Sequence, residues 1–309
     1  MDWKLKASLY NWIDKLPNNI ASKLQYLLQT RLGQLRNCNP ILDFKNGVSI
    51  AASALENGQQ INSCSVIEVG TGRRINVPIG LWLLGASSIV TIDLNPYLKW
   101  ELIDKDLDFI KANSEQVKAI FPLELRPKDF ELRFAKLLDI DSSKHELAKI
   151  LNLKYIAPGD ASNLPLASNS VDLHISRSVL EHIPPETLKK IFQEGKRVLR
   201  PSGFLIHQIH LGDHMATFDK SISSINFLQY DDPTWSKLAG NGFMYHNRLR
   251  LQEYIDIFVD IGLDIIKIKD RCVDGKALSL LQKGFPLNER FQKFDLEMNA
   301  TNFAQIIAK

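Results

Sequence analysis

Hydrophobic residues recur at helical spacing from residue 1 to about residue 36, and after residue 64 they form short apolar runs instead. In the N-terminal segment, Leu5, Leu9, Ile13 and Leu16 share one helical face, and a break near "LPNN" precedes a second leucine-rich run. Because the pattern is short and carries acidic residues, it favours a helical lid packed on the main domain over a membrane-surface helix. We therefore expect an N-terminal helical lid at residues 1–60.

From residue 64 onward, apolar runs alternate with helical patterns. The runs "CSVIEVG", "SIVTIDL", "KYIAPGDA", "SVDLHISRS" and "GFLIHQIHL" predict strands, and "PIGLWLLGA" and "PETLKKIFQEGKRVL" predict helices between them. A later amphipathic helix, "LRLQEYIDIFVDIG", precedes another strand, "LDIIKIKD". This alternation is typical of an α/β fold with a mostly parallel sheet and helices on both faces. Residues 212–247 interrupt it, so we expect a substrate-facing insert there, within one domain that spans residues 61–309.

The composition of the chain indicates the class of protein and its cellular location, but not the reaction. The 309 residues are 45% hydrophobic and 24% charged, with a formal net charge of +3, which is ordinary for a globular protein and predicts no nucleic-acid partner. Three cysteines far apart in the sequence indicate no disulfide framework, so we expect a cytoplasmic protein. The most apolar window, residues 77–92, is too short and too broken for a membrane span and predicts a buried helix followed by a buried strand.

A glycine turn follows the first predicted strand, in the segment "SVIEVGTGRRIN". Ligands of such sheets bind beyond the carboxyl ends of the strands, where Glu68, Gly70 and Gly72 are placed. The glycines permit backbone angles and a close ligand approach that a Cβ atom would prevent. A dinucleotide fingerprint requires a further glycine three residues after Gly72, and that residue is Ile75. A pyrophosphate cradle is therefore disfavoured, and the lysine of a P-loop is absent.

An acidic residue ends the second predicted strand. Asp93 lies 21 residues after Gly72, where a carboxylate can accept hydrogen bonds from both hydroxyl groups of a ribose. Such charge-assisted hydrogen bonds contribute about 1.5–3 kcal/mol each. From these residues alone, NAD and other adenosine ligands both remain open.

Two further segments carry a resemblance to a known family. In "GDASNLPLASNSVDLHISRSVLEHIP" an acidic residue follows the third strand and a polar end follows the fourth, and "EGKRVLRPSGFLI" closes a helix with a turn into the fifth. Together with the glycine turn, this pattern resembles the class I S-adenosylmethionine-dependent methyltransferases over roughly residues 64–212. The resemblance implies a Rossmann-like, seven-stranded fold and S-adenosyl-L-methionine as the cofactor.

The resemblance also implies roles for individual residues. Glu68, Gly70 and Gly72 would frame the methionine part of the cofactor, and Asp93 would hold its ribose. The rest of the expected cofactor set is Thr71, Leu94, Asp160 at the adenine amino group, Ala161 against the adenine ring, and Ser176 near the methionine end. Arg74 departs from the glycine that is commoner in the family, which affects the expected shape of the turn after Gly72.

Histidine is the natural candidate for a general base, where the acceptor of the methyl group holds a proton. His214, which Asp213 would orient, follows the fifth strand and is the first choice, and His182, which follows the fourth strand, is the second. A structural role for each of these histidines remains an alternative. We expect no metal, because His207 and His210 face opposite sides of a strand.

The segment after residue 212 leaves two questions open. Arg248 and Arg250 either clamp a carboxylate or phosphate of the acceptor, or pair with acids such as Asp231 or Asp232. The aromatic residues of the same segment either line an acceptor pocket or form the core of the insert. They are Phe218, Phe227, Tyr230, Trp235 and Tyr245.

The sequence thus predicts a methyltransferase that acts on a small molecule. Neither a basic strip nor an "NPPY-like" motif after the fourth strand is present, which favours an oxygen, or a small-molecule nitrogen, as the acceptor atom. A secondary metabolite or a glycan precursor is the expected acceptor class. Two alternatives are a nicotinamide-dependent oxidoreductase and a non-catalytic module that retains the cofactor fold.

Overall fold

The computed structural model describes residues 2–36, 39–140 and 144–309, and the chain divides into two compact units. The first unit comprises residues 1–36, 178–189 and 208–306, and the second comprises residues 37–177, 190–207 and 307–309. Each unit has a hydrophobic core of its own.

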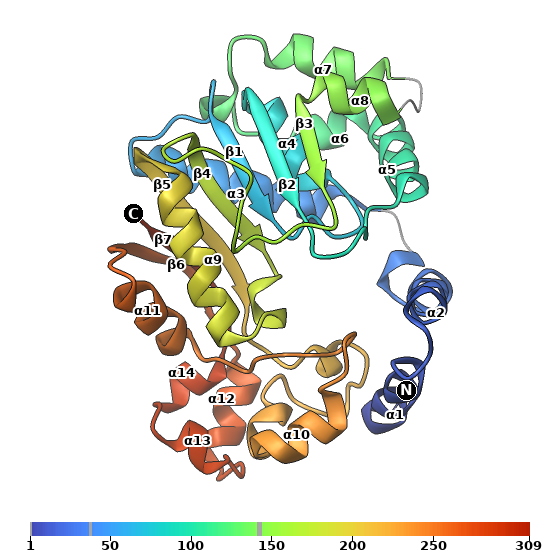
Figure 1. Ribbon diagram of the computed structural model, residues 1–309, viewed down its shortest axis with the longest axis vertical. Coiled ribbons are helices and arrows are strands. Elements are labelled where there is room, and N and C mark those ends of the chain that lie inside the picture. The colour runs from blue at the N-terminus through green and yellow to red at the C-terminus, as the bar shows by residue number, and fades with distance from the viewer. Residues whose placement is uncertain (1, 37–38, 141–143) are drawn as a thin grey trace. The chain divides into compact units, whose positions relative to one another are not determined.

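The second unit contains most of the alternating strands and helices (Figure 1). In chain order its elements are α3 (Ile41–Glu56), β1 (Ser65–Val69), α4 (Asn76–Leu83), β2 (Ser88–Ile92), α5 (Trp100–Ala112), α6 (Ser114–Lys118), η2 (Leu123–Leu125), α7 (Phe130–Leu138), α8 (Lys144–Ile150), β3 (Leu153–Ile156) and β4 (Val171–Arg177). Helix α9 (Pro185–Val198), β5 (Leu199–His210) and β7 (Thr301–Ala308) have residues in both units.

The first unit consists mainly of helices and contains the strand β6. Its elements are α1 (Trp3–Ile13), α2 (Asn18–Arg31), η1 (Gln34–Arg36), η3 (Leu180–His182), η4 (His214–Thr217), η5 (Asn226–Gln229), α10 (Asp232–Ala239), α11 (Leu251–Asp260), β6 (Ile265–Val273), α12 (Gly275–Gln282), α13 (Glu289–Gln292) and α14 (Leu296–Ala300).

Seven strands form a single sheet in the order β3-β2-β1-β4-β5-β7-β6. Strand β1 pairs in parallel with β2 and with β4, and β2 pairs in parallel with β3. In the register Val69 is opposite Ile92 and Ser176, so the carboxyl ends of β1, β2 and β4 are aligned. The sheet is mixed rather than wholly parallel. The predicted α/β, Rossmann-like fold is confirmed.

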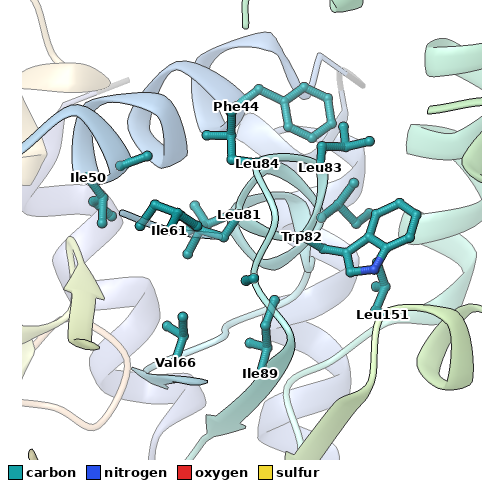
Figure 2. Packing of buried hydrophobic residues seen from close by; sticks show 14 of the residues in the cluster. Phe44, Ile50, Ile61, Val66, Leu81, Trp82, Leu83, Leu84, Ile89 and Leu151 are labelled. Carbon is teal, nitrogen blue, oxygen red and sulfur yellow. The ribbon is translucent and has the colours of Figure 1, made fainter. Parts of the chain in front are cut away.

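The core of the second unit lies around α4. All eight residues of α4 are buried, as the apolar window in the sequence predicts. Figure 2 shows this helix between α3, which contributes Phe44 and Ile50, and the strands, which contribute Val66 and Ile89. Because a helix that is apolar on every side has no face suited to water, α4 is stable only inside such a core.

The core of the first unit is rich in aromatic residues. Trp3 of α1 stacks on Trp235 of α10 with 6.1 Å between ring centroids, and Phe227 packs against the same ring. The Nδ2 atom of Asn11 donates to the carbonyl of Lys237 at 3.1 Å, which fixes α1 to α10. Phe227 and Trp235 are therefore core residues of the insert. This agrees with the interpretation that the aromatic residues form the core of the insert rather than line an acceptor pocket. A lid function for residues 1–60 remains a prediction.

Candidate functional site

The glycine turn after β1 requires glycine for its backbone conformation. Gly70 and Gly72 have φ angles of 81° and 69°, a left-handed region that other residues rarely adopt. The amide of Gly70 donates to the carbonyl of Ile92 at 2.8 Å, which holds the turn against the end of β2. A Cβ atom built on Gly72 would meet no atom within 4 Å, so the space beside this residue is open.

Asp93 joins the glycine turn to two neighbouring strands. Its carboxylate accepts from the amide of Gly72 at 3.1 and 3.2 Å and from the hydroxyl of Tyr155, on β3, at 3.1 Å. The side chain is nearly buried, and this burial raises the pKa of Asp93 to about 6, although the hydrogen bonds oppose the shift. The predicted ribose-binding acid and the predicted turn therefore belong to one hydrogen-bonded arrangement.

Glu68 lies buried at the end of β1. The hydroxyl of Thr91 donates to its Oε2 atom at 2.8 Å, and Thr71 contacts the same hydroxyl. Burial raises the pKa of Glu68 to about 8, and the nearby Asp93 adds to this effect. A buried carboxyl group of this kind favours a cationic partner, because a positive charge lowers the cost of its ionised form. We call Glu68, Gly70, Thr71, Gly72 and Asp93 the glycine-turn site.

Arg74 explains how the turn continues without a third glycine. Its guanidinium is paired with the fully buried carboxylate of Asp106 on α5, and it donates to the carbonyl of Leu102 at 3.3 Å. The Nδ2 atom of Asn76 donates to the second oxygen of Asp106 at 3.2 Å. The turn is thereby fixed to α5 by side chains, where a third glycine would rely on close backbone packing. Ile75 is completely buried at the start of α4.

The other expected cofactor residues differ in exposure. Asp160 is exposed and accepts from the amide and the hydroxyl of Ser162, which lowers its pKa. Ala161 is half-buried and Leu94 is 73% exposed. The amide of Gly159 donates to the carbonyl of Asp93 at 2.8 Å, so the segment before Asp160 is attached to the glycine-turn site.

Ser176, at the end of β4, is bonded to a buried pair of histidines. Its hydroxyl lies 2.8 Å from Nδ1 of His207, and Nε2 of His207 lies 3.3 Å from Nδ1 of His174. Burial lowers the pKa of both histidines, to about 4 for His174, so both rings are neutral at physiological pH. His207 is thus a core residue that positions the Ser176 hydroxyl.

The first unit contains a cluster of four histidines and one glutamate, which we call the histidine cluster: Glu181, His182, His210, His214 and His246. The ring of His214 lies at its centre, with centroid distances of 4.5 to 5.1 Å to the other three rings. Two groups of three could hold a metal ion, because their ligand atoms lie within 4.8 Å of one another. They are His210, His214 and His246, and Glu181, His182 and His214.

The carboxylate that faces His214 is Glu181. Its Oε1 atom lies 3.7 Å from Nε2 of His214, and the glutamate is completely buried. Asp213, which the sequence suggests as the orienting acid, accepts from the amide of Met215 at 2.8 Å and from Asn226 at 3.1 Å. Its carboxylate therefore caps η4, and the orienting role predicted for it is not seen. Burial, with the adjacent histidines, lowers the pKa of His214 to about 2.

The comparisons with known proteins bear on the enzyme class. Residues 125–207 match the protein family described as "Methyltransferase domain", a range that includes Asp160, Ala161 and Ser176. This match supports the predicted class I, S-adenosylmethionine-dependent methyltransferase. A comparison with curated proteins finds no match.

Several solved structures resemble this methyltransferase at low identity. A methyltransferase from Methanosarcina mazei is 17% identical, covering 82% of this chain and 95% of that chain, with a TM-score of 0.45. A methyltransferase from Mesorhizobium loti is 12% identical, with 85% and 99% covered and a TM-score of 0.41. Magnesium protoporphyrin IX methyltransferase from Synechocystis PCC 6803 is 13% identical, with 86% and 83% covered and a TM-score of 0.43.

The family match confirms the predicted enzyme class and its cofactor, S-adenosyl-L-methionine. The nicotinamide-dependent alternative is therefore dropped. The roles of individual residues remain predictions. In the described part of the chain, no helix is both long enough and apolar enough to cross a membrane.

Arg248 and Arg250 have structural partners in the methyltransferase. Arg248, almost completely buried, donates to the carbonyls of Phe227 and Tyr230 at 2.7 Å each and pairs with Asp232. Arg250, completely buried, donates to the carbonyl of Leu211 at 2.6 Å. The guanidinium of Arg248 holds the insert together and pairs with Asp232, as the alternative of internal pairing predicts. The carbonyl partners of Arg250 lie outside the insert.

Some residues of the two sites were not identified from the sequence. Tyr155 and Thr91 hydrogen-bond the two buried acids, and their places on strands β3 and β2 are the only signal that they reach that edge. His246, between Tyr245 and the two arginines, is also a member of the histidine cluster. No spacing in the sequence connects it to His214.

Proposed function

We propose that this methyltransferase transfers a methyl group from S-adenosylmethionine to an oxygen, or a nitrogen, of a small-molecule acceptor such as a secondary metabolite or a glycan precursor. The observation that supports it most is the hydrogen-bonded pairing of the glycine turn with Asp93. When bound, the cofactor supplies the methyl group. The sequence features that disfavour nucleic acid, a mild net charge and no basic strip, support a small acceptor.

In this proposal the glycine-turn site holds the methionine and ribose parts of the cofactor. The open space beside Gly72 allows close approach, and the buried carboxyl group of Glu68 suits the ammonium group of the methionine part. Asp160 and Ala161 take the adenine, Ser176 lies towards the methionine end, and Thr71 and Leu94 complete the set. Alignment of the acceptor with the methyl group supplies most of the acceleration, because the departing thioether is neutral.

The proposed base is His214, with His182 as the second choice. Burial and the adjacent histidines lower the pKa of His214, which a nearby negative charge would oppose; the carboxyl group of Glu181 lies 3.7 Å from the ring. Asp213 acts indirectly, by capping η4, the helix in which His214 lies. We further propose that residues 212–247 face the acceptor and that residues 1–60 act as a lid.

The test combines an acceptor screen with one substitution. The purified protein is incubated with labelled S-adenosylmethionine and fractionated small-molecule extracts, and products are followed by their mass shift. His214→Ala should lower the methylation rate about 10²–10⁴-fold, the usual contribution of a general base, without changing cofactor affinity. Lys220→Ala, on the exposed surface of the same segment, serves as the control. An undiminished rate for His214→Ala with the true acceptor removes this residue from the mechanism.

A further inference from the structure

We propose that Glu181, His182 and His214 form a binding site for one divalent transition-metal ion. One carboxylate oxygen and two imidazole nitrogens from these residues lie within 4.8 Å of one another. Two histidines and one carboxylate are a donor set that binds zinc and other divalent transition metals and leaves positions open for water or an oxygen ligand.

The hydrogen bond of His182 prepares this ring for a metal. Its Nδ1 atom lies 2.8 Å from the carbonyl oxygen of Tyr245, and a carbonyl can only accept. The ring therefore carries its proton on Nδ1, which leaves a free lone pair on Nε2. A ligating histidine usually donates its second N–H to a carbonyl or a carboxylate in this way, because the bond fixes the tautomer and the ring orientation.

The same reasoning separates this group from the alternative of His210, His214 and His246. The amide of Arg248 donates to Nδ1 of His246 at 3.2 Å, so that atom is an acceptor. In the neutral ring the proton is then on Nε2, which is buried and has no hydrogen-bond partner in the described part of the chain. A protonated nitrogen cannot ligate a metal, so His246 is a neighbour of the site rather than a ligand.

Burial and access are also suited to a metal. Glu181 is completely buried, where an ionised carboxylate is costly unless a positive charge compensates it. His182 is exposed and the side chain of His214 is 31% exposed, so an ion reaches the site from solvent. The expectation from the sequence, that no metal site exists here, rests on His207 and His210, and neither belongs to this group.

This site does not depend on the proposed function, but it shares His214 with the proposed base. A nitrogen that ligates a metal has no lone pair left for a proton. His214 therefore acts as a base only in the metal-free protein, and metal binding is measured without any methyl transfer.

The experiment uses the untagged chain with Cys272→Ser, which removes an exposed thiol, a group whose thiolate is a metal ligand. After treatment with a chelator, zinc is added in a calorimeter, and cobalt(II) is added separately to record the visible absorption that reports its ligands. About one zinc ion per chain should bind. Glu181→Gln and His182→Gln should each weaken binding about a hundredfold or more, since even partners of the ligands contribute 10- to 100-fold.

His210→Gln is the matched control, because His210 belongs only to the alternative group. The zinc affinity of this variant should stay within about threefold of that of the Cys272→Ser parent. Circular dichroism checks the fold of each variant, and His182→Gln, at an exposed position, keeps the test valid if Glu181→Gln fails to fold. The proposal is overturned by no zinc binding in the Cys272→Ser parent, by binding that survives both ligand substitutions, or by a loss confined to His210→Gln.

Discussion

The glycine-turn site and the histidine cluster are organised in opposite ways. At the glycine-turn site, backbone amides and hydroxyl groups bond the two buried acids, as the amide of Gly72 bonds Asp93 and Thr91 bonds Glu68. In the histidine cluster the rings contact one another, and the ring of His182 bonds the carbonyl of Tyr245. The first site is held by a backbone amide and by hydroxyl groups at the ends of neighbouring strands. The second depends on side chains from separate segments of the chain.

The largest effect is expected from removing the ion pair that replaces the third glycine. Arg74→Ala leaves the carboxylate of Asp106 buried without its guanidinium partner, and breaking such a pair costs about 3–5 kcal/mol. The free energy of unfolding should fall by that amount in urea denaturation. Arg73→Ala, at the adjacent half-buried position, should cost less than about 1 kcal/mol. Equal losses for both variants would mean that the ion pair does not stabilise the turn.

Asp93 tests whether the glycine-turn site binds the cofactor. Asp93→Ala removes the acceptor proposed for the ribose hydroxyls and should weaken binding of S-adenosylmethionine about ten- to a hundredfold, as the loss of one or two hydrogen bonds implies. Calorimetry measures the affinity, with Asp108→Ala, at an exposed position on α5, as the control. Unchanged affinity in Asp93→Ala would refute the ribose assignment.

The same contrast explains what the sequence predicts. Gly70, Gly72 and Asp93 each follow closely after an apolar run, so the sequence alone identifies them as residues at strand ends. The parallel pairing of β1 with β2 then brings these strand ends together. The edge of β3 that supplies Tyr155 has no such signal. Strand β7 was not predicted, because Thr301–Ala308 lacks the alternation of a half-buried strand: its last five residues are all buried, and they include Gln305.

The histidine cluster lies beyond this kind of prediction. His214 and His182 were candidates because each follows a strand, but their neighbours depend on the course of the insert. His246 reaches the cluster because Arg248 and Arg250 hold that segment in place by bonds to carbonyls distant in the sequence. Asp213 is adjacent to His214 in the sequence, and its carboxylate caps η4. Its role in orienting His214 stays a prediction. An aspartate at the start of a short helix bonds the helix amides, as Asp213 bonds the amide of Met215.

The smallest effect concerns pH at the glycine-turn site. With a pKa of about 8, Glu68 is about one-tenth ionised at pH 7 and about half ionised at pH 8. A cationic methionine part binds the ionised form, so the affinity should rise about fivefold from pH 7 to pH 8. Below pH 7 it should fall further as Asp93, with a pKa of about 6, also gains a proton. Calorimetry at constant ionic strength with S-adenosylhomocysteine, which keeps the ammonium group, measures the slope. Glu68→Gln should flatten it between pH 7 and pH 8, and a slope that persists in this variant would assign the proton to another group.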